Sequence, residues 1–365
     1  MKILFFIDGF RKGGKERRLI ELLKAIEDER IDYRVVVIHP EIEYEISPGI
    51  RSKIVWLKKK KKKDLSPFFE FYKICKGFNP DIIHTWSSMV TFYSIPAKVL
   101  LRKRLINSQI TDAPPNYNKW SIFGITCRTS FFFSDLIISN SKAGLKAYDA
   151  ISKKSKVIYN GVELTRFGIK ETKEEIKSEL GISTVYSIVM VASFSNYKDY
   201  KTYIQVANEF QKIREDITFL AIGDGENLHS CKSYAEELNL TNLKFLGQRN
   251  DVEKILKACD IGILISKVEL HGEGISNSII EYMAMSLPVI ANDAGGTKEI
   301  VDYGINGFLA LTNIIEKITE KISFLLDNHT FRLQMGNTAR KTIEEKFNIN
   351  HMLAEFLKEF VIIKK

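Results

Sequence analysis

Short apolar runs alternate with longer stretches of helical periodicity along the first half of the chain. The apolar runs predict buried strands at residues 3–7, 33–38, 54–57, 81–84, 105–110, 135–139 and 156–159. Apolar positions at helical spacing predict helices at residues 16–27, 67–78, 90–101, 122–133 and 143–150. Strands that alternate with helices in this way favour a parallel sheet covered by helices on both faces.

The second half repeats the alternation. Strands are predicted at residues 187–192, 218–222, 243–246, 261–265, 288–292 and 307–310. Helices are predicted at residues 202–213, 228–238, 252–258, 297–301, 314–326, 331–346 and 352–361, with one more that begins near residue 276 and ends before Pro288. The charged, helix-prone segment at 170–180, closed by Gly181, is interpreted as a connection.

The predicted fold class is therefore α/β, with two Rossmann-like, doubly wound domains that face each other across a cleft. We place the first domain at residues 1–168 and the second at 182–345. A C-terminal helix at 346–365 could return to the first domain. In sheets of this kind, ligands bind at the carboxyl ends of the strands.

Length and composition agree with two packed domains. A chain of 365 residues is too long for one ordinary core, and 45% of the residues are hydrophobic. The four cysteines form no C-x-x-C pair, which favours reduced thiols and a cytoplasmic location. The first predicted strand begins at once, and no apolar run approaches roughly 18 residues, so we expect neither a signal peptide nor a spanning helix.

The positive charge is concentrated in one place. The net charge is +9, and residues 58–63 are six consecutive lysines. Nucleic acid, an anionic membrane surface and an idle solvated loop are all compatible with such a run. No nucleic-acid-binding signature accompanies it, so we expect no nucleic acid partner. The aromatic segment at 68–72 favours the anionic membrane over the idle loop.

The stretch at residues 261–290 carries the strongest chemical signal. A buried strand ends at Ser266, a glycine-rich loop follows, and then a helix begins near Ser276 and Asn277. Backbone N–H groups at a helix start bind anions such as phosphate, and here Gly274 and Ile275 lead into that start. Glu273 in the loop and Glu281 in the helix can each accept paired hydrogen bonds from vicinal hydroxyls. Phosphate and hydroxyl recognition together indicate a nucleotide sugar.

Glu281 has a second interpretation. Residues 278–281 read Ser-Ile-Ile-Glu, which fits a capping box in which Glu281 only satisfies the start of its helix. Gly272 and Gly274 on either side of Glu273 favour a ligand, because glycine lets a bound group approach the backbone closely.

The spacing of these two glutamates resembles the E-x7-E signature of family 4 (group 1) retaining glycosyltransferases, which have the GT-B fold. The surrounding residues are similar too, since the family has a strand ending in Ser, then Glu-Gly, a Glu-Ala-Met-Ala-like helix and a Pro-Val strand. Here Glu281-Tyr282-Met283-Ala284 corresponds to the start of that helix. The resemblance covers nearly the whole chain and is best at residues 186–310.

The resemblance extends to two phosphate-binding loops. Residues 13–16, Gly-Gly-Lys-Glu, are similar to the family's Gly-Gly-x-Glu element, so Gly14 is a candidate donor contact. After the first strand of the second half, the family has an Arg and a Lys that grip the donor diphosphate. Lys198 matches the lysine, whereas Ser193 stands at the arginine position. That departure implies a weaker diphosphate grip.

Sugar and acceptor contacts are the least defined part of the site. His84 matches a histidine that ends a strand in the family, although a lone strand-end histidine is more often a hydrogen-bonded structural residue. Many members have a further histidine after the strand at 105–110. This chain has none there, which makes Thr111 and Asp112 candidates for the sugar contact. His271 is the better histidine candidate.

The resemblance implies a metal-independent, retaining glycosyltransferase in surface-polysaccharide biosynthesis, peripheral at the cytoplasmic membrane face, with a nucleoside-diphosphate sugar as co-substrate and a lipid-linked or saccharide acceptor. Lys198 and the helix start would neutralise the diphosphate, Glu281 would hold the ribose, and Glu273 would position the sugar. No D-x-D pair or metal-ligand spacing is present, so no metal or cofactor is expected. A nucleotide-sugar epimerase and a non-catalytic nucleotide-sugar-binding protein remain the alternatives.

Overall fold

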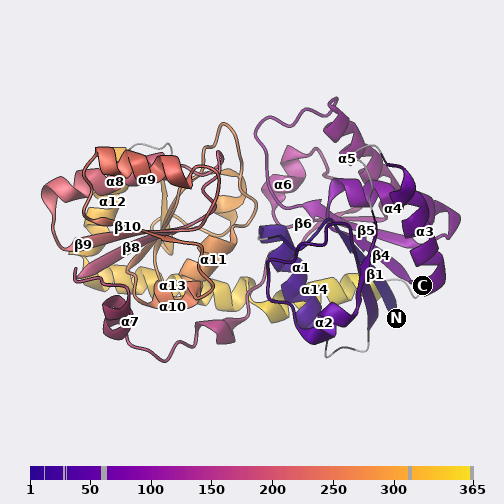
Figure 1. Cartoon of the computed structure of the whole chain (residues 1–365), viewed down its shortest axis with the longest axis horizontal. Helices are drawn as coiled ribbons and strands as arrows, with labels where there is room; N and C mark the ends of the chain where they lie inside the picture. Colours follow the sequence, from indigo (N-terminus) through magenta and orange to yellow (C-terminus); the bar gives the residue numbers. More distant parts are fainter. Residues whose placement is uncertain (12, 28, 30, 59–63, 311–314, 362–365) are drawn as a thin grey trace. The chain divides into compact units, whose positions relative to one another are not determined.

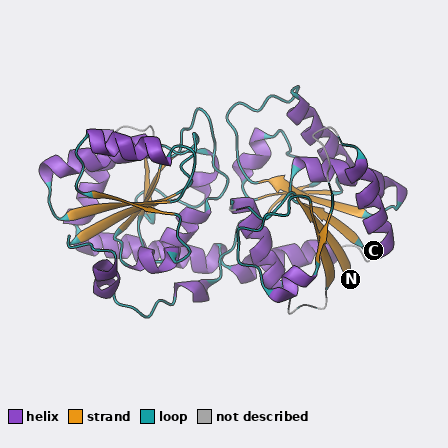
Figure 2. Ribbon diagram, in the orientation of Figure 1, coloured by secondary structure: helices purple, strands orange, loops and turns teal. Residues whose placement is uncertain are grey.

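The chain divides into two compact units in the computed structural model, which describes residues 1–11, 13–27, 29, 31–58, 64–310 and 315–361. The first unit combines Met1–Gly161 with Ile349–Lys365, and the second is Val162–Asn348. Each unit is a parallel sheet with helices on both faces, as Figures 1 and 2 show. The chain therefore has the α/β architecture of two Rossmann-like units.

In the described part of the first unit, seven parallel strands lie in the order β3-β2-β1-β4-β5-β6-β7. The strands are β1 (Lys2–Ile7), β2 (Asp32–Val37), β3 (Ile54–Trp56), β4 (Ile82–Thr85), β5 (Arg104–Ile110), β6 (Leu136–Ser139) and β7 (Ser155–Val157). The helices are α1 (Gly14–Ala25), α2 (Pro48–Ser52), α3 (Ser66–Phe78), α4 (Ser88–Leu100), α5 (Ile122–Phe133), α6 (Lys142–Ala147) and α14 (Ile349–Val361).

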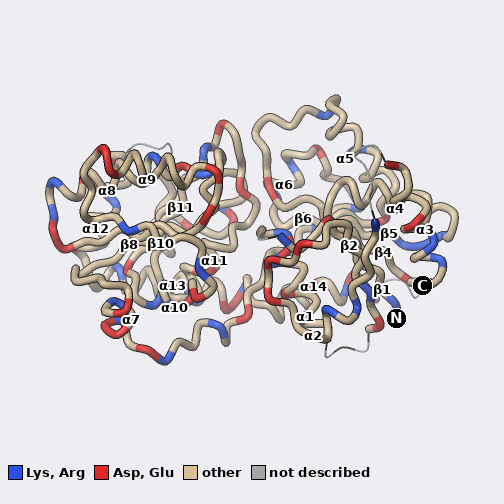
Figure 3. Tube along the Cα trace, in the orientation of Figure 1, with Lys and Arg blue, Asp and Glu red and all other residues tan. Residues whose placement is uncertain are grey.

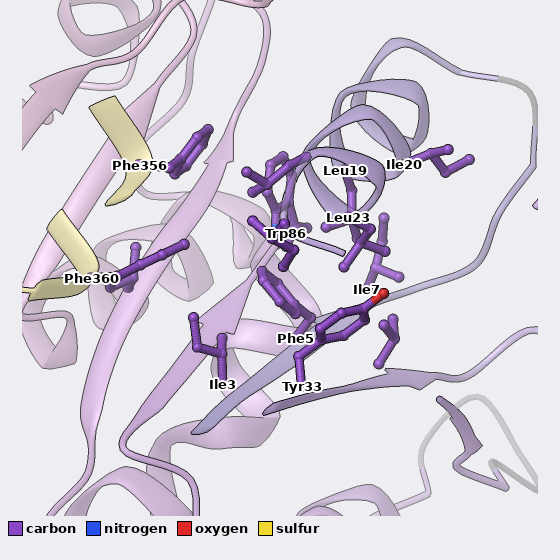
Figure 4. Close-up of a cluster of buried hydrophobic side chains, with 14 of the residues drawn as sticks. Ile3, Phe5, Ile7, Leu19, Ile20, Leu23, Tyr33, Trp86, Phe356 and Phe360 are labelled. Atoms are coloured by element: carbon purple, nitrogen blue, oxygen red, sulfur yellow. The ribbon is translucent and has the colours of Figure 1, made fainter. Parts of the chain in front are cut away.

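Successive side chains of a strand point to opposite faces of the sheet, which explains the two core layers of the first unit. In β1, Ile3, Phe5 and Ile7 face one layer, whereas Leu4 and Phe6 face the other. The first layer lies under α1 and α14, and the second lies under α3 and α4. Figure 4 shows the first layer, with its side chains gathered between the sheet and the helices.

Helix α14 belongs to the first unit although it follows the second unit in the chain. It packs against α1 (Figure 1), and Phe356 and Phe360 are fully buried. Arg18 of α1 is also buried, and its guanidinium lies 5.3 Å from the Phe356 ring centroid. Burial lowers the pKa of Arg18 to about 9. Lys156 reaches Glu359 of α14 at 2.8 Å, which ties this helix to β7.

In the described part of the second unit, six parallel strands lie in the order β10-β9-β8-β11-β12-β13. The strands are β8 (Tyr186–Val191), β9 (Ile217–Ile222), β10 (Leu243–Gly247), β11 (Ile261–Leu264), β12 (Val289–Asn292) and β13 (Gly307–Ala310). The α-helices are α7 (Lys173–Glu179), α8 (Tyr200–Ile213), α9 (Leu228–Glu237), α10 (Val252–Lys257), α11 (Asn277–Ala284), α12 (Ile315–Asp327) and α13 (His329–Lys346). Two 3-10 helices, η1 (Leu164–Phe167) and η2 (Gly295–Glu299), complete it.

The unit boundary falls at residue 161, before the predicted end of the first domain at 168. The segment interpreted as a connection is part of the second unit. It contains α7, which begins with a true capping box between Thr172 and Glu175. Lys173 of this helix pairs with Asp260 at 2.7 Å, next to the start of β11. A helix bound to the strands is a structural part of the unit rather than a linker.

Candidate active site

The candidate site lies at the carboxyl ends of β8 and β11, the two adjacent strands where the strand order of the second sheet reverses. Such a switch point is where doubly wound sheets bind ligands. The loop after β8 supplies Lys198, and the loop after β11 supplies Ser266 and Glu273. The loops are joined, because Lys198 and Ser266 form an isolated antiparallel bridge. The Asp199 N–H also donates to the Ile265 carbonyl at 2.9 Å.

Glu273 is the centre of this cluster. Its residue is only 7% exposed, and Oε1 accepts hydrogen bonds from the Lys198 ammonium and the Ser266 hydroxyl. The Lys198 ammonium also lies 3.3 Å from the Ser266 Oγ. Burial alone raises the pKa of the Glu273 carboxyl, but the charge of Lys198 and these hydrogen bonds hold that pKa below its usual value. Glu273 is therefore a buried carboxylate in its ionised form.

His271 lies at the outer side of this cluster. Its Nε2 is 3.9 Å from Oε2 of Glu273, whereas Lys198 and Ser266 bond to Oε1. The His271 ring packs against Tyr197, with 5.1 Å between ring centroids. The His271 side chain keeps 22% of its surface exposed. His271 therefore adjoins the carboxylate, and its contact with a sugar stays a prediction.

Asn292 at the end of β12 is a part of the site that sequence reasoning missed. Its side-chain amide donates to the Ser266 carbonyl, and its Oδ1 accepts from the Ser266 N–H at 3.0 Å. Because Ser266 holds Glu273, Asn292 fixes the carboxylate indirectly. A polar residue that ends a buried strand next to β11 was the available signal, since ends of neighbouring parallel strands meet at one edge of the sheet.

Helix α11 begins at Asn277, shortly after Glu273 in the chain. Gly274 and Ile275 are buried, and Ser276 is the N-cap residue before Asn277. The Glu273 carbonyl accepts from the Gly296 N–H at 2.7 Å, which ties this loop to η2. The first N–H groups of a helix have no partner within that helix. Thus the predicted anion-binding residues, 274–277, adjoin the Lys198–Glu273 pair.

Two contacts fix α11 against the sheet. A Cβ atom added to Gly262 would lie 2.3 Å from the Tyr282 ring, so glycine is needed in β11 for the helix to approach. The Tyr282 hydroxyl accepts from the Val191 N–H at 2.6 Å and lies 3.2 Å from the Ile263 carbonyl. Through these two hydrogen bonds the Tyr282 hydroxyl links β8 to β11.

Glu281 is 3% exposed and lies beside Arg166, whose Nη2 is 3.8 Å from Glu281 Oε1. Arg166 also pairs with Glu253. The capping-box interpretation is wrong, because Ser276 rather than Ser278 is the N-cap residue, and Ser278 donates its hydroxyl to the Val191 carbonyl at 2.7 Å. Arg166 was not foreseen, since it lies in η1, far from α11 in the sequence.

Ser193 is exposed, and its hydroxyl donates to Ser195 Oγ at 3.2 Å. Next to it, Phe194 is fully buried and stacks on Tyr200 at 3.7 Å between centroids. Phe194 thus fixes the loop after β8 to the core, whereas Ser193 faces solvent. Among the described residues of this loop, 192–199, Lys198 is the one cation.

In the first unit, Gly14 begins α1 at the carboxyl end of β1. Lys15 next to it lies 3.0 Å from Asp8 and 3.3 Å from Glu16. Burial lowers the pKa of Lys15, but these two carboxylates raise that pKa above its usual value. Ser87, after β4, donates to Asp8 at 2.7 Å. The glycine pair therefore adjoins a polar cluster at the switch point of the first sheet.

His84 is placed differently from the prediction that it touches a sugar. It is fully buried inside β4, among Phe5, Trp86 and Phe356, and its Nε2 bonds to the Ser108 hydroxyl at 2.7 Å. Burial moves the pKa of His84 well below its usual value. This environment fits the structural role and corrects the contact prediction, because no surface of the ring is accessible.

Thr111 and Asp112 follow β5 and are half-buried. Asp112 accepts a hydrogen bond from the Tyr148 hydroxyl at 2.9 Å, and the Thr111 carbonyl accepts from the Asn140 side chain at 3.2 Å. Both follow the carboxyl end of β5, and Gly14 likewise follows the carboxyl end of β1. Their contact with a sugar stays a prediction.

The predicted membrane segment is only partly described. Lys58 is exposed, and residues 59–63 of the lysine run lie outside the described residues. Of the aromatic residues after it, Phe71 is buried and stacks on Phe6, while Phe68 packs against Tyr93. Phe69 is 69% exposed. Most of this aromatic segment therefore belongs to the core.

Within the described residues, no group of three His, Cys, Asp or Glu side chains could hold a metal ion. The helices in the same ranges include none long and apolar enough to cross a membrane. The four cysteines are free thiols, and three of them are buried.

Known proteins resemble both units. The model "Glycosyltransferase Family 4" matches residues 12–166, and "Glycosyl transferases group 1" matches residues 172–342. The N-acetyl-alpha-D-glucosaminyl L-malate synthase of Bacillus anthracis is 24% identical over 314 residues, 80% of this chain and 77% of that protein. The UDP-Gal:alpha-D-GlcNAc-diphosphoundecaprenol alpha-1,3-galactosyltransferase of Escherichia coli is 27% identical over 303 residues, 79% and 76% of the two chains.

The fold is shared with solved structures. The crystal structure of Anabaena HepE in complex with UDP-glucose has a TM-score of 0.84 at 20% identity and covers 99% of each chain. The structure of WaaG, a glycosyltransferase of lipopolysaccharide biosynthesis, has a TM-score of 0.76 at 15% identity over the whole of each chain. Since the two family models together match both units, this chain belongs to the family 4, group 1 glycosyltransferases and has their GT-B fold of two Rossmann-like units.

Proposed function

We propose that this glycosyltransferase moves a sugar, with retention and without a metal ion, from a nucleoside-diphosphate sugar to a hydroxyl of a lipid-linked saccharide at the cytoplasmic membrane face. The observation that carries the proposal is the cluster of Lys198, Ser266 and Glu273 beside the start of α11. It offers a cation and helix N–H groups for a diphosphate, and an ionised carboxylate for a sugar.

The donor's leaving group sets the chemical task. When the bond between the sugar's C1 and the diphosphate breaks, its electron pair goes to the phosphate oxygen and positive charge develops on the sugar. Preorganised charges that match this separation lower the barrier. Lys198 and the α11 start would stabilise the diphosphate. Glu273 would hold the sugar hydroxyls and face the developing positive charge, and Glu281 would hold the ribose.

The relatives support the substrate classes. The Escherichia coli relative is named for a UDP-galactose donor and a diphosphoundecaprenol acceptor. A Campylobacter jejuni relative, 28% identical over 180 residues, is named an N,N'-diacetylbacillosaminyl-diphospho-undecaprenol alpha-1,3-N-acetylgalactosaminyltransferase. We therefore assign this chain a nucleotide-sugar donor and an undecaprenyl-type acceptor as its substrate classes.

A screen of nucleotide sugars by thermal shift tests the donor proposal, because a ligand that binds only the folded state stabilises it by RT ln(1 + [L]/Kd). A donor that raises the melting temperature is then used, with a labelled sugar, in turnover assays with chelator present. Transfer to a lipid-linked acceptor in chelator, with the anomeric configuration of the donor kept, is the expected result. Loss of activity in chelator, inversion, or interconversion of the donor without transfer would contradict the proposal.

A further inference from the structure

Arg166 lies between two carboxylates that come from different helices of the second unit. Its Nη2 pairs with Glu253 of α10 and lies 3.8 Å from Oε1 of Glu281 in α11. The exposed fractions of the three side chains are 26% for Arg166, 14% for Glu253 and 4% for Glu281. These residues, which we call the Arg166 triad, therefore form a largely buried cluster with one cation and two carboxyl groups.

Local contacts hold Arg166 in this position. It lies in η1, where Glu163 caps the turn by accepting from the Thr165 N–H at 3.2 Å. The next residue, Phe167, is buried, and the Arg166 guanidinium lies 5.8 Å from its ring centroid. Helix α10, which carries Glu253 in its first turn, packs against η1. The guanidinium is therefore fixed by its own turn and by α10.

The surroundings of Glu281 make a nearby cation important. Helix α11 packs mainly against α13, β11 and β12, and the two strands contain no charged residue. Helix α13 brings Arg340 to α11, but this side chain bonds to the Ala284 carbonyl and pairs with Glu344 at 2.7 Å. The Tyr282 hydroxyl bonds to the backbone of β8 and β11. Arg166 is therefore the cation that the structure places beside Glu281.

The ionised form of Glu281 is the form that suits hydroxyl recognition, because a carboxylate accepts stronger hydrogen bonds than a neutral carboxyl group does. Burial to 3% exposure favours the neutral form, whereas a guanidinium at 3.8 Å favours the ionised form. Basic and acidic residues are interspersed along the second unit in Figure 3, so no broad excess of positive charge replaces this local partner. We therefore expect the ionisation of Glu281 to depend on Arg166.

We propose that Arg166 is a positioning residue for donor recognition, which keeps Glu281 ionised and oriented toward the ribose of the nucleotide. This inference rests on the proposed function, in which the Glu281 carboxylate holds the ribose hydroxyls. Arg166 acts through Glu281 and does not contact the donor itself. Glu253 has the supporting role of holding the guanidinium in place.

Two other roles for Arg166 fit the triad less well. As a phosphate-binding cation, Arg166 would attract an anion to a cluster of two carboxylates and one cation, where the excess charge is negative. As a purely structural pair, Arg166 and Glu253 would already balance each other, and a further buried carboxylate would only add the cost of burying its charge. Recognition of hydroxyl groups gives the second carboxylate, Glu281, a purpose.

The test compares nucleotides with and without the 2′-hydroxyl, since the loss of this group reports on the carboxylate that holds the ribose. UDP, ADP and GDP and their 2′-deoxy forms are titrated calorimetrically into the wild type, and the nucleotide that binds is then used for the variants. We expect the ribonucleotide to bind about tenfold or more tightly than its 2′-deoxy form, which is typical of a hydrogen bond to a charged group.

Arg166→Gln should lower the affinity for the ribonucleotide to roughly that of the 2′-deoxy form at about pH 7, and leave the affinity for the 2′-deoxy form unchanged. Arg166→Met, which keeps the apolar stem of the side chain, is a second neutral variant with the same expected result. A loss that is confined to the ribonucleotide is not expected from a general weakening of the fold.

The ratio of the two affinities should also become dependent on pH in Arg166→Gln. Removing the guanidinium raises the pKa of Glu281, so its neutral form gains population as the pH falls. Between about pH 6 and about pH 8.5 the ratio should stay constant in the wild type and rise with pH in Arg166→Gln. Ionisation of the nucleotide phosphates affects both nucleotides equally and cancels in the ratio.

Three further variants sharpen the comparison. Arg166→Lys keeps a cation beside Glu281 and should retain most of the ratio. In a Glu281→Gln background, Arg166→Gln should cause no further loss, because both changes remove the same interaction. The matched control is Arg214→Gln, since Arg214 is similarly buried, at 22% exposure, and pairs with Asp216 and Asp327 in the same unit. This control should keep the wild-type ratio.

The outcomes separate this proposal from the proposed function. Equal losses of affinity for both nucleotides in Arg166→Gln, or a wild-type ratio at every pH, would show that Arg166 does not act through the ribose and would overturn the inference alone. A wild type that binds both nucleotides equally would remove Glu281 from the ribose and overturn the inference, while the nucleotide-sugar donor would stand. Failure of every nucleotide to bind the wild type would refute the proposed function, and the inference with it.

Discussion

The ammonium of Lys198 and the carboxylate of Glu273 form an ion pair that joins the loop after β8 to the loop after β11. Both side chains are largely buried, at 14% and 10% exposure. A buried cation beside the expected diphosphate position is therefore held in place before a donor arrives. Preorganised charge of this kind needs little rearrangement during reaction.

We expect Lys198→Ala to abolish most transfer activity, because no other described cation of its loop can replace it. A charge-assisted contact to an anion contributes about 1.5–3 kcal/mol, which is roughly a tenfold to hundredfold effect. Turnover and donor affinity of the variant would be measured beside Lys201→Ala, an exposed lysine at the start of α8. Normal diphosphate affinity in Lys198→Ala would show that another cation holds the diphosphate.

The stability of the second unit should depend on the ionisation of Glu273. The folded-state pKa of this carboxyl lies below its unfolded value of about 4.3, so the ionised form stabilises the fold above about pH 4.3. That stabilisation is lost as the pH falls through the folded-state pKa. The difference in free energy of unfolding between wild type and Glu273→Gln should be large near neutral pH and shrink on acidification.

Urea unfolding at about pH 7 and in acid measures this difference. The control is Glu209→Gln, an exposed glutamate whose pair with Lys212 lies on the surface of α8. A difference for Glu273→Gln that is the same at both pH values would show that the carboxylate is not ionised in the fold. Turnover of Glu273→Gln should also fall, because a neutral amide does not stabilise the positive charge that develops on the sugar as a carboxylate does.

Glu281→Gln should weaken donor binding and leave stability nearly unchanged. The chain contains a matched control in α7, where Glu175 is part of a true capping box with Thr172. Thr172→Ala should cost about 1 kcal/mol of stability, Glu175→Gln should also lower stability, and both variants should keep their donor affinity. Isothermal titration and thermal unfolding of both variants provide the comparison. A reversed pattern would remove Glu281 from the donor site.

Asn292→Ala should lower turnover more than it weakens donor binding, because the residue positions Ser266 and, through it, Glu273. We expect a loss of about 1–3 kcal/mol of stability from the two unpaired Ser266 backbone groups. Asn306→Ala is the control, since Asn306 is equally buried in the same unit and bonds to Ile300 and Asp302. Equal turnover in the two variants would reduce Asn292 to a structural role.

Much of the fold could be predicted because its strands are continuous apolar runs. Residues 3–7 and 261–265 were recognisable as buried strands from composition alone, and β1 and β11 occupy them. The segment at 170–180 was misread as a connection, because charge on a short helix gives no sign of which surface it binds. Its contact between Lys173 and Asp260 is a tertiary one, which no local pattern reveals.

The candidate site, like the fold, could be predicted only in part from the sequence. Glu273 could be found because its glycine-rich loop follows a buried strand, and Lys198 because its loop resembles the family's phosphate-binding loop. The structure brings these two side chains together. Arg166 could not, since it reaches Glu281 from η1, far away in the sequence. Asn292 was missed although its position at the end of a strand next to β11 was a usable signal. His84 shows the opposite error, because a strand-end position does not reveal that aromatic side chains from α14 will cover the ring.

The return of α14 to the first unit also sets an order of events during synthesis. A ribosome makes β1 to β7 early, but the layer that receives Phe356 and Phe360 stays open until the entire second unit has been translated. Domains usually fold as they emerge, from the N-terminus onward. In this protein the first unit can close its core only afterwards. A product that terminates before residue 349 would therefore expose a large apolar surface around Trp86 and be a natural substrate for chaperones and proteases.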